Sequence, residues 1–305
     1  MSIKLYHCDQ HPIPLPPGHK FPTRKYYLLR EALEQSGAPF EFRPAPLAEL
    51  GAVRRVHDSD YVDQFLAGRL EPAAVRRIGF PWSEHLVRRT LASVGGTMSA
   101  ASSALEDGIS GVLAGGTHHA FRAEGSGFCV FNDIAVAIED VRSRGFASRF
   151  AIIDLDVHQG DGTAKLFEED DCVLTLSVHG RNNFPFRKQR SKIDIDLDDW
   201  TEDEPYLEAV ASGLAEVRSF RPEMVFYQSG VDGLREDKLG RLGLTHQGLI
   251  QRDRLVFLEV RALDVPCVIT LGGGYADPIE LTVQAHANTY LTAAEIFRKR
   301  NEATG

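Results

Sequence analysis

Three side chains that can bind a metal alternate along a short stretch of the chain. Asp154, Asp156 and His158 lie two residues apart, at and just beyond the end of an apolar run. Alternate side chains of an extended chain point to the same side, so these three can face one ion. Carboxylate oxygen and imidazole nitrogen suit Zn²⁺ or Fe²⁺, and three protein ligands with one open position are typical of a catalytic site.

Asp232 follows another apolar run and is a candidate for the third metal ligand. The alternative role for an aspartate at the end of a parallel strand is to cap a helix or to accept a hydrogen bond within a loop. A metal site is favoured over this alternative when Asp232 is included.

The adjacent pair His118 and His119 follows two glycines at the end of a third apolar run. Two histidines close to several carboxylates can acquire different pKa values from different aspartate partners and so serve proton transfer. Asp154 and Asp161 are the candidate partners. The alternative is a structural turn that leaves one histidine on the outside.

Three consecutive glycines at 272–274 precede Tyr275 after a fourth apolar run. Backbone N–H groups in a glycine turn can bind an anion, but the lysine of a GxxxxGK[ST] loop and the GxGxxG spacing are both missing. A tyrosine beside a metal can donate its phenolic O–H to a developing oxyanion. We therefore expect Tyr275 to assist catalysis as a hydrogen-bond donor.

Apolar, β-branched runs alternate along the chain with segments of helical periodicity, which indicates βαβ units. The predicted strands are 3–6, 111–114, 150–155, 173–178, 224–227 and 265–271. The predicted helices are 84–107, 132–144, 162–169, 204–219, 247–263 and 278–299. We predict a three-layer α/β/α fold with a mainly parallel central sheet, in one domain over residues 1–305, with 11–22 as a surface loop. Ligands of such sheets bind beyond the carboxyl ends of the strands, where the residues above lie.

Composition narrows the functional classes. The 305 residues contain 34 Lys+Arg and 43 Asp+Glu, a net charge of -9, which opposes a broad DNA-binding surface, so no nucleic acid partner is expected. The four cysteines are widely separated, which is typical of a reducing cytoplasm. No signal peptide and no membrane span are predicted, because long apolar runs are missing.

Five segments together resemble the zinc-dependent histone deacetylases and their bacterial relatives, which share the arginase-type α/β fold. The segments are HDSDYV at 57–62, GGTHHAFRAEGSGFCVFND at 115–133, IDLDVHQGDG at 153–162, SGVD at 229–232 and LGGGY at 271–275. Gln159 stands where many members have a second histidine. With FPTRKY at 21–26 and the compact length, this substitution resembles the class IV branch.

The resemblance implies a role for each candidate residue. The implied zinc ligands, with Fe²⁺ as the alternative metal, are Asp156, His158 and Asp232. The implied catalytic residues are His119 as general base and then acid, His118 as its electrostatic partner, Asp161 and Asp154 as the carboxylates that orient them, and Tyr275 as donor to the substrate carbonyl. The implied substrate-binding residues are Gly127, Phe128, Gly273, Gly274 and, on the opposite wall, Phe186 or Phe184. A structural K⁺ is implied near Asp154, Ser177 and Val178, with backbone carbonyls around Asp156 and His158.

The function implied is hydrolysis of an acetyl or longer acyl group from a lysine side chain of a protein or peptide. The alternative is an amidohydrolase for acetylpolyamines or other small acylated amines, and the net negative charge suits a cationic amine in either case. A non-catalytic acyl-lysine reader is disfavoured because the positions for every catalytic role are filled. Gly160 and Gly230 stand where a two-metal arginase-like site needs acids, so a single metal is expected.

Overall fold

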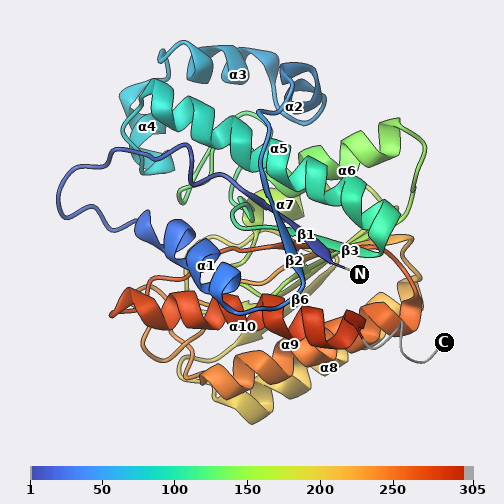
Figure 1. Cartoon of the computed structure of the whole chain (residues 1–305). Coiled ribbons are helices and arrows are strands. Elements are labelled where there is room, and N and C mark those ends of the chain that lie inside the picture. The colour runs from blue at the N-terminus through green and yellow to red at the C-terminus, as the bar shows by residue number, and fades with distance from the viewer. Residues whose placement is uncertain (1, 299–305) are drawn as a thin grey trace.

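Residues 2–298, which this computed structural model describes, form one sheet of eight parallel strands (Figure 1). The strands are β1 (Ile3–His7), β2 (Phe40–Pro44), β3 (Ile109–Val112), β4 (Phe150–Asp154), β5 (Val173–Gly180), β6 (Ile193–Leu197), β7 (Met224–Gln228) and β8 (Cys267–Thr270). Their order across the sheet is β2-β1-β3-β8-β7-β4-β5-β6. Every residue of the five central strands is buried, as expected where helices cover both faces.

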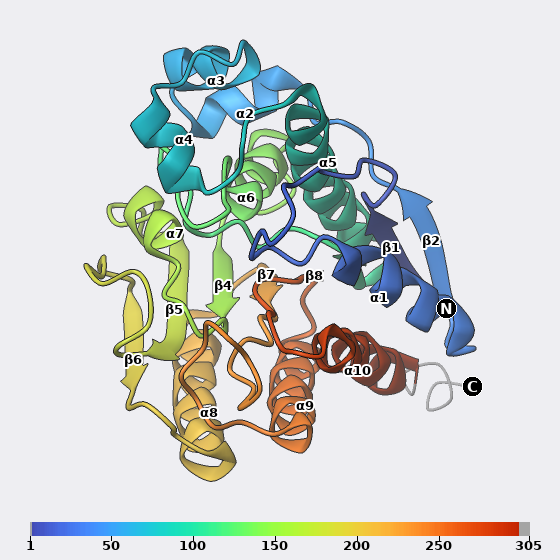
Figure 2. The same cartoon turned by 90° about the vertical axis from the view of Figure 1, so that its left-hand side faces the viewer.

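Helices cover the sheet on both faces, so the predicted three-layer α/β/α fold is confirmed (Figure 2). One face carries α1 (Arg24–Gln35), α8 (Asp203–Phe220), α9 (His246–Leu263) and α10 (Ile279–Arg298). The other carries α5 (Glu84–Asp107), α6 (Asp133–Ser143) and α7 (Asp161–Leu166), with α2 (Leu50–Val56), α3 (Ser59–Leu66) and α4 (Pro72–Ile78) packed beyond them. A separate apolar core lies on each side of the sheet.

The six predicted strands and six predicted helices are present, with end shifts of a few residues. The largest shift among them is at 162–169, where α7 ends three residues early at Leu166, and β3 lies two residues earlier than predicted at both ends. Lys299, the last residue of the predicted final helix, lies outside the described residues. Residues 11–22 contain no helix or strand, as predicted for a surface loop.

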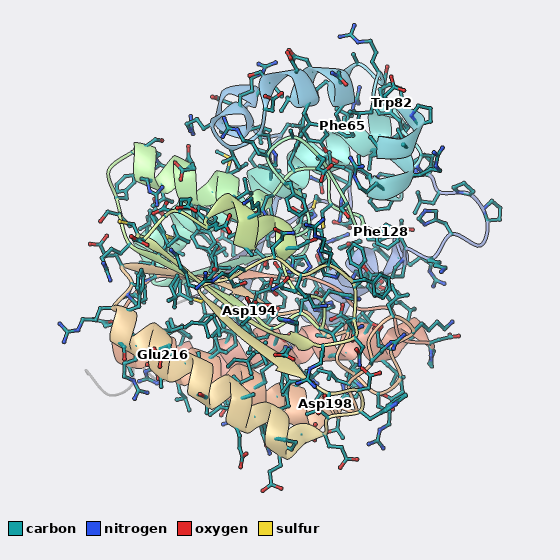
Figure 3. All side chains as sticks on the ribbon, turned by 180° about the vertical axis from the view of Figure 1, so that it is seen from behind. Phe65, Trp82, Phe128, Asp194, Asp198 and Glu216 are labelled. Atoms are coloured by element: carbon teal, nitrogen blue, oxygen red, sulfur yellow. The ribbon has the colours of Figure 1, made fainter. Side chains whose placement is uncertain are left out.

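Six elements were not predicted from the sequence: α1 to α4, β2 and β6. The strand β6 lies at the edge of the sheet and alternates partly buried apolar residues with exposed aspartates, one of which, Asp194, is labelled in Figure 3. Its pattern is that of a one-sided strand rather than the continuous apolar run of the central strands. The helices α2 to α4 span only seven or eight residues each, too short for a clear periodicity.

The carboxyl ends of the central strands bring distant parts of the chain together. In the sheet register, Asp154 at the end of β4 stands beside Gln228 of β7 on one side and Ser177 of β5 on the other. Gln228 in turn stands beside Thr270 of β8. The loops that follow β3, β4, β7 and β8 therefore meet at the end of the sheet where the strands have their carboxyl ends. No helix within residues 2–298 is long and apolar enough to cross a membrane.

Candidate active site

A buried cluster at the carboxyl end of the sheet consists of Asp156, His158 and Asp232. Their ligand atoms all lie within 4.8 Å of one another. The Nδ1 atom of His158 is 3.0 Å from Asp156 Oδ1 and 3.0 Å from Asp232 Oδ2. The loops after β4 and β7 thus bring together the three residues expected as metal ligands, across 74 positions of sequence.

Backbone groups hold both carboxylates in place. Gly273 N–H donates to Asp156 Oδ2 at 2.6 Å, and Val157 N–H donates to Asp232 Oδ1 at 2.9 Å. A Cβ atom at Gly273 would overlap Asp232, and one at Gly230 would overlap Asp156. Glycine is therefore required at both positions because the backbone packs directly on the carboxylates.

The cluster has the electrostatics expected of a divalent cation site. Burial and the negative charge of Asp156 raise the pKa of Asp232 to about 7. Two buried carboxylates this close repel each other, and a bound cation removes that repulsion. Two oxygen donors and one nitrogen donor suit Zn²⁺ or Fe²⁺. The residues present therefore fit a single divalent metal ion.

The two adjacent histidines each donate a hydrogen bond to their own aspartate. His118 Nδ1 lies 2.7 Å from Asp154 Oδ2, and His119 Nδ1 lies 2.7 Å from Asp161 Oδ1. All four side chains are buried. The imidazole rings pack with centroids 4.0 Å apart, and the ring of His119 lies 6.1 Å from that of His158. The Nδ1 contacts leave Nε2 of each ring as the atom available for proton transfer.

The histidine pair is split into a charged and a neutral member. Burial opposes protonation of His118, but the Asp154 carboxylate outweighs it and raises the pKa of His118 to about 9. Burial and the positive charge of His118 lower the pKa of His119 to about 4. At neutral pH, His118 is therefore an imidazolium and His119 a neutral base, as proton transfer by one member requires.

Tyr275 lines the same pocket as the metal cluster and the histidine pair. Its backbone N–H donates to Asp237 Oδ2 at 2.6 Å, which fixes the chain after the glycine turn. Burial raises the pKa of the Tyr275 phenol well above its usual range. The phenol therefore stays protonated and keeps its O–H for donation.

The expected substrate-binding residues lie at two depths. Gly127, Phe128 and Gly273 line the inner pocket, while Gly274 is not part of its lining. Phe184 packs edge-on against His119, with ring centroids 4.9 Å apart. Of the two aromatic candidates for the opposite wall, Phe184 is thus the inner one.

Phe186, the other aromatic candidate, lies at the mouth of the pocket with 86% of its surface exposed. Gln159 holds the loop that carries it, because its side-chain amide donates to Gln189 O at 2.7 Å and accepts from Gln189 N–H at 2.8 Å. On the facing wall, Phe128 packs against Phe21 of the N-terminal loop, with ring centroids 5.2 Å apart. Figure 3 labels Phe128 beside this loop.

The residues expected near a structural K⁺ lie on neighbouring strands. Asp154 in β4 stands opposite Ser177 in β5, and Val178 is the next residue along β5. All three are buried. The Ser177 hydroxyl lies 3.0 Å from Nδ1 of His179.

Asp133 supports the loop of the histidine pair, although no role was predicted for it. Its carboxylate accepts hydrogen bonds from the Thr97 hydroxyl at 2.6 Å, Gly116 N–H at 3.1 Å and Thr117 N–H at 2.7 Å. Gly116 has a positive φ of 72°, and a Cβ atom there would overlap the backbone of Gly272, so this turn packs against the glycine turn before Tyr275. The sequence signal that could have pointed to Asp133 is its position at the end of the segment GFCVFND.

Lys25 and Arg252 support the two other loops. Lys25 is buried, with Nζ 3.4 Å from both Gly272 O and Gly274 O, and burial lowers its pKa to about 8. Arg252 is fully buried and donates from Nη1 to Gly230 O at 2.5 Å. Lys25 belongs to the segment FPTRKY, whereas no sequence pattern singled out Arg252.

Comparisons with known proteins agree with this geometry. A model of the histone deacetylase domain matches residues 19–291. An uncharacterised protein of Picosynechococcus sp. is 43% identical over 296 residues, which cover 96% of this chain and 98% of that protein. Histone deacetylase 2 of Arabidopsis thaliana is 37% identical over 186 residues, which cover 60% of this chain and about half, 48%, of that protein.

Among solved structures, the crystal structure of acetylpolyamine aminohydrolase from Burkholderia pseudomallei superposes with a TM-score of 0.81 at 21% identity, over 97% of this chain and 99% of that one. This likeness shows the arginase/deacetylase fold. The fold, the buried Asp–His–Asp cluster and the sequence matches together define a hydrolytic deacetylase. The chain belongs to the histone deacetylase family.

Proposed function

We propose that this protein hydrolyses an acetyl or longer acyl group from the side-chain amine of lysine, in the cytoplasm. The observation that carries the proposal is the placement of two buried His–Asp pairs, His118 with Asp154 and His119 with Asp161, beside a buried Asp–His–Asp cluster. Amide hydrolysis needs an activated water, a polarised carbonyl and a proton for the departing amine. The site has a group for each requirement.

The metal ligands on this proposal are Asp156, His158 and Asp232. Zn²⁺, with Fe²⁺ as the alternative, would supply Lewis acidity for activating water and polarising the acyl carbonyl. A K⁺ ion beside Asp154, Ser177 and Val178 would neutralise buried charge behind the histidine pair. The cluster geometry and the burial of these residues support both assignments.

His119 moves the proton. As a neutral base it accepts a proton at Nε2 from the attacking water, while Asp161 stabilises the imidazolium through Nδ1–H. The same proton then passes to the amine nitrogen as the carbon–nitrogen bond breaks, which leaves a carboxylic acid and a free lysine amine. At neutral pH the acid gives up its remaining proton and the amine takes one up, so the final products are a carboxylate and a lysine ammonium group. His118, held charged by Asp154, contributes positive charge to the site throughout.

Tyr275 donates its phenolic O–H to the carbonyl oxygen as negative charge develops there. The buried glycine turn beneath it, held by Lys25 and by Asp237, keeps the phenol at the pocket. On this proposal the acylated side chain enters between Phe128, which follows Gly127, and Phe184, which packs on His119. Both aromatic residues line the mouth. Phe186 and Gly273 complete the proposed substrate contacts, whereas Gly274 does not line the inner pocket.

The alternative substrate is an acetylpolyamine, which the likeness to the Burkholderia acetylpolyamine aminohydrolase supports. Both substrates present an acylated amine on a flexible chain, so the catalytic residues serve either. What differs is the charge next to the acyl chain, which the residues at the mouth must accommodate.

The proposal is tested by incubating the zinc-loaded protein with an acetyl-lysine peptide and measuring acetate and free peptide by mass spectrometry. Tyr275→Phe should keep its metal but lose turnover by about 100- to 1,000-fold, the usual effect of removing an oxyanion donor. Unchanged turnover in this variant would refute the role of Tyr275. Absence of hydrolysis of every acyl-lysine peptide by the wild-type protein would refute the function.

A further inference from the structure

The mouth of the pocket is lined by cationic side chains from three separate parts of the chain. A cavity of about 500 Å³ opens outward from His119, His158 and Tyr275. Lys20 of the N-terminal loop, Arg77 at the end of α4 and Arg241 of the loop after β7 line it. Among the described residues that form this lining, none is an aspartate or glutamate.

Acidic residues outside the lining neutralise only part of this charge. Arg77 pairs with Glu124 at 2.8 Å, and Arg241 pairs with Asp199 at 3.3 Å. The side chains of the Arg77 pair are both more than 40% exposed, so water screens the pair strongly. Lys20 is exposed and makes no ion pair with any carboxylate in residues 2–298. The mouth therefore keeps a positive charge, although the chain as a whole carries -9.

We propose that the mouth selects acyl-lysines that are flanked by acidic residues in a peptide or protein chain. This inference rests on the proposed deacylase function and names its substrate class. Carboxylates beside the acyl-lysine would lie close to Lys20, Arg77 and Arg241. Phe186, largely exposed at the same mouth, offers an apolar surface for the flanking chain, which a small free amine would leave uncovered.

The same charges act against a cationic substrate. The remaining ammonium groups of an acetylpolyamine would lie at the mouth, where like charges repel them. The overall negative charge of the chain therefore does not describe the pocket entrance, where three cationic side chains line the cavity. Lys20, Arg77 and Arg241 are specificity-determining residues on this view, not catalytic ones.

The test compares three acetyl-lysine peptides that differ only in flanking residues: glutamate, alanine or lysine. Charges at the mouth change the rate at which the enzyme and a charged peptide associate, and salt screens this effect. At about 50 mM NaCl, kcat/KM for the glutamate peptide should therefore exceed that for the lysine peptide by about tenfold or more. The ratio should shrink towards one at about 500 mM NaCl. N-acetylated spermidine should be a poorer substrate than the alanine peptide.

Charge-reversing variants assign the effect to the mouth. Lys20→Glu should reduce the glutamate-to-lysine ratio severalfold, and the triple variant K20E/R77E/R241E should reverse it. Arg76→Glu is the matched control, because it makes the same charge change on α4 but does not line the cavity. Lys20 makes no ion pair whose loss would unfold the protein, so the single variant stays informative if the triple variant misfolds.

Each outcome decides one claim. Hydrolysis of all three peptides with equal kcat/KM, or a preference for the lysine peptide or acetylspermidine, would overturn the inference and leave the deacylase function standing. A ratio changed as much by Arg76→Glu as by Lys20→Glu would also overturn it. Failure to hydrolyse the alanine peptide in both its acetyl-lysine form and its longer acyl-lysine forms would refute the proposed function, and the inference with it.

Discussion

Replacing Arg252 with methionine removes a cation that is fully buried behind the metal-binding cluster. Arg252 donates to Asp253 Oδ1 through Nε at 3.0 Å and lies 2.8 Å from it through Nη2, and neither side chain has any exposed surface. Asp253 also accepts from the hydroxyl groups of Tyr227 at 2.5 Å and Thr289 at 2.7 Å. The variant therefore leaves a buried carboxylate with two neutral donors and no cation.

The cost follows from this burial. Breaking a fully buried ion pair on one side destabilises a protein by about 3 to 5 kcal/mol, because the remaining charge is uncompensated. The total free energy of unfolding of a protein is about 5 to 15 kcal/mol, so the loss of this ion pair would remove a large share of the stability. Gly230 also loses the donor to its carbonyl, and Gly230 packs on Asp156 two residues before Asp232, so metal affinity should fall as well.

Urea unfolding measures the first effect, and competition with a chelator measures the second. The control is Arg254→Met on the same helix, whose pair with Glu295 is more than 40% exposed on both sides and should be worth about 1 kcal/mol or less. A loss below about 1 kcal/mol for Arg252→Met would refute the claim that this pair supports the site.

Three further changes probe the histidine loops and the metal cluster. Burial lowers the pKa of His57 from 6.5 to about 4, so between these pH values the unfolded chain binds a proton that the folded chain does not. The free energy of unfolding should therefore fall by roughly 3 kcal/mol as the pH is lowered from about 6.5 to about 4. Urea titrations should show a smaller pH dependence for His57→Gln. Asp161→Asn should lower kcat on an acetyl-lysine peptide by about 10- to 100-fold with metal content unchanged, because a neutral amide stabilises the imidazolium that His119 forms during the reaction less than a carboxylate does. An unaltered kcat would remove Asp161 from the mechanism. Gly273→Ala should reduce the amount of metal bound per chain, because the new Cβ atom would overlap Asp232. The control Gly51→Ala, whose Cβ atom has no neighbour within 4 Å, should bind as much metal as the wild type. Equal metal content in the two variants would contradict the packing of Gly273 on Asp232.

The central sheet was predictable because its strands are buried on both faces and therefore read as continuous apolar runs. The edge strand β6 was not, since it alternates Ile and Asp. The position of each candidate ligand directly after an apolar run was also visible, which placed Asp156, His158 and Asp232 at one edge of a parallel sheet. Strand order was not visible, so the adjacency of β4 and β7 that joins these residues came from the structure.

The supporting residues could not be predicted for a different reason. Asp133, Lys25 and Arg252 act largely through backbone N–H and carbonyl groups of loops far away in sequence. Such contacts leave no periodicity and need no particular residue type in the partner loop. The positive mouth was hidden in the same way, because Lys20, Arg77 and Arg241 are scattered through a chain of negative net charge.

The most direct test of the proposed chemistry is anomalous diffraction at the zinc absorption edge from crystals of the zinc-loaded protein. We expect one strong peak per chain, within coordination distance of Asp156, His158 and Asp232 together. A peak elsewhere, two peaks at this site or none at all would contradict the single-metal site on which the deacylase proposal depends.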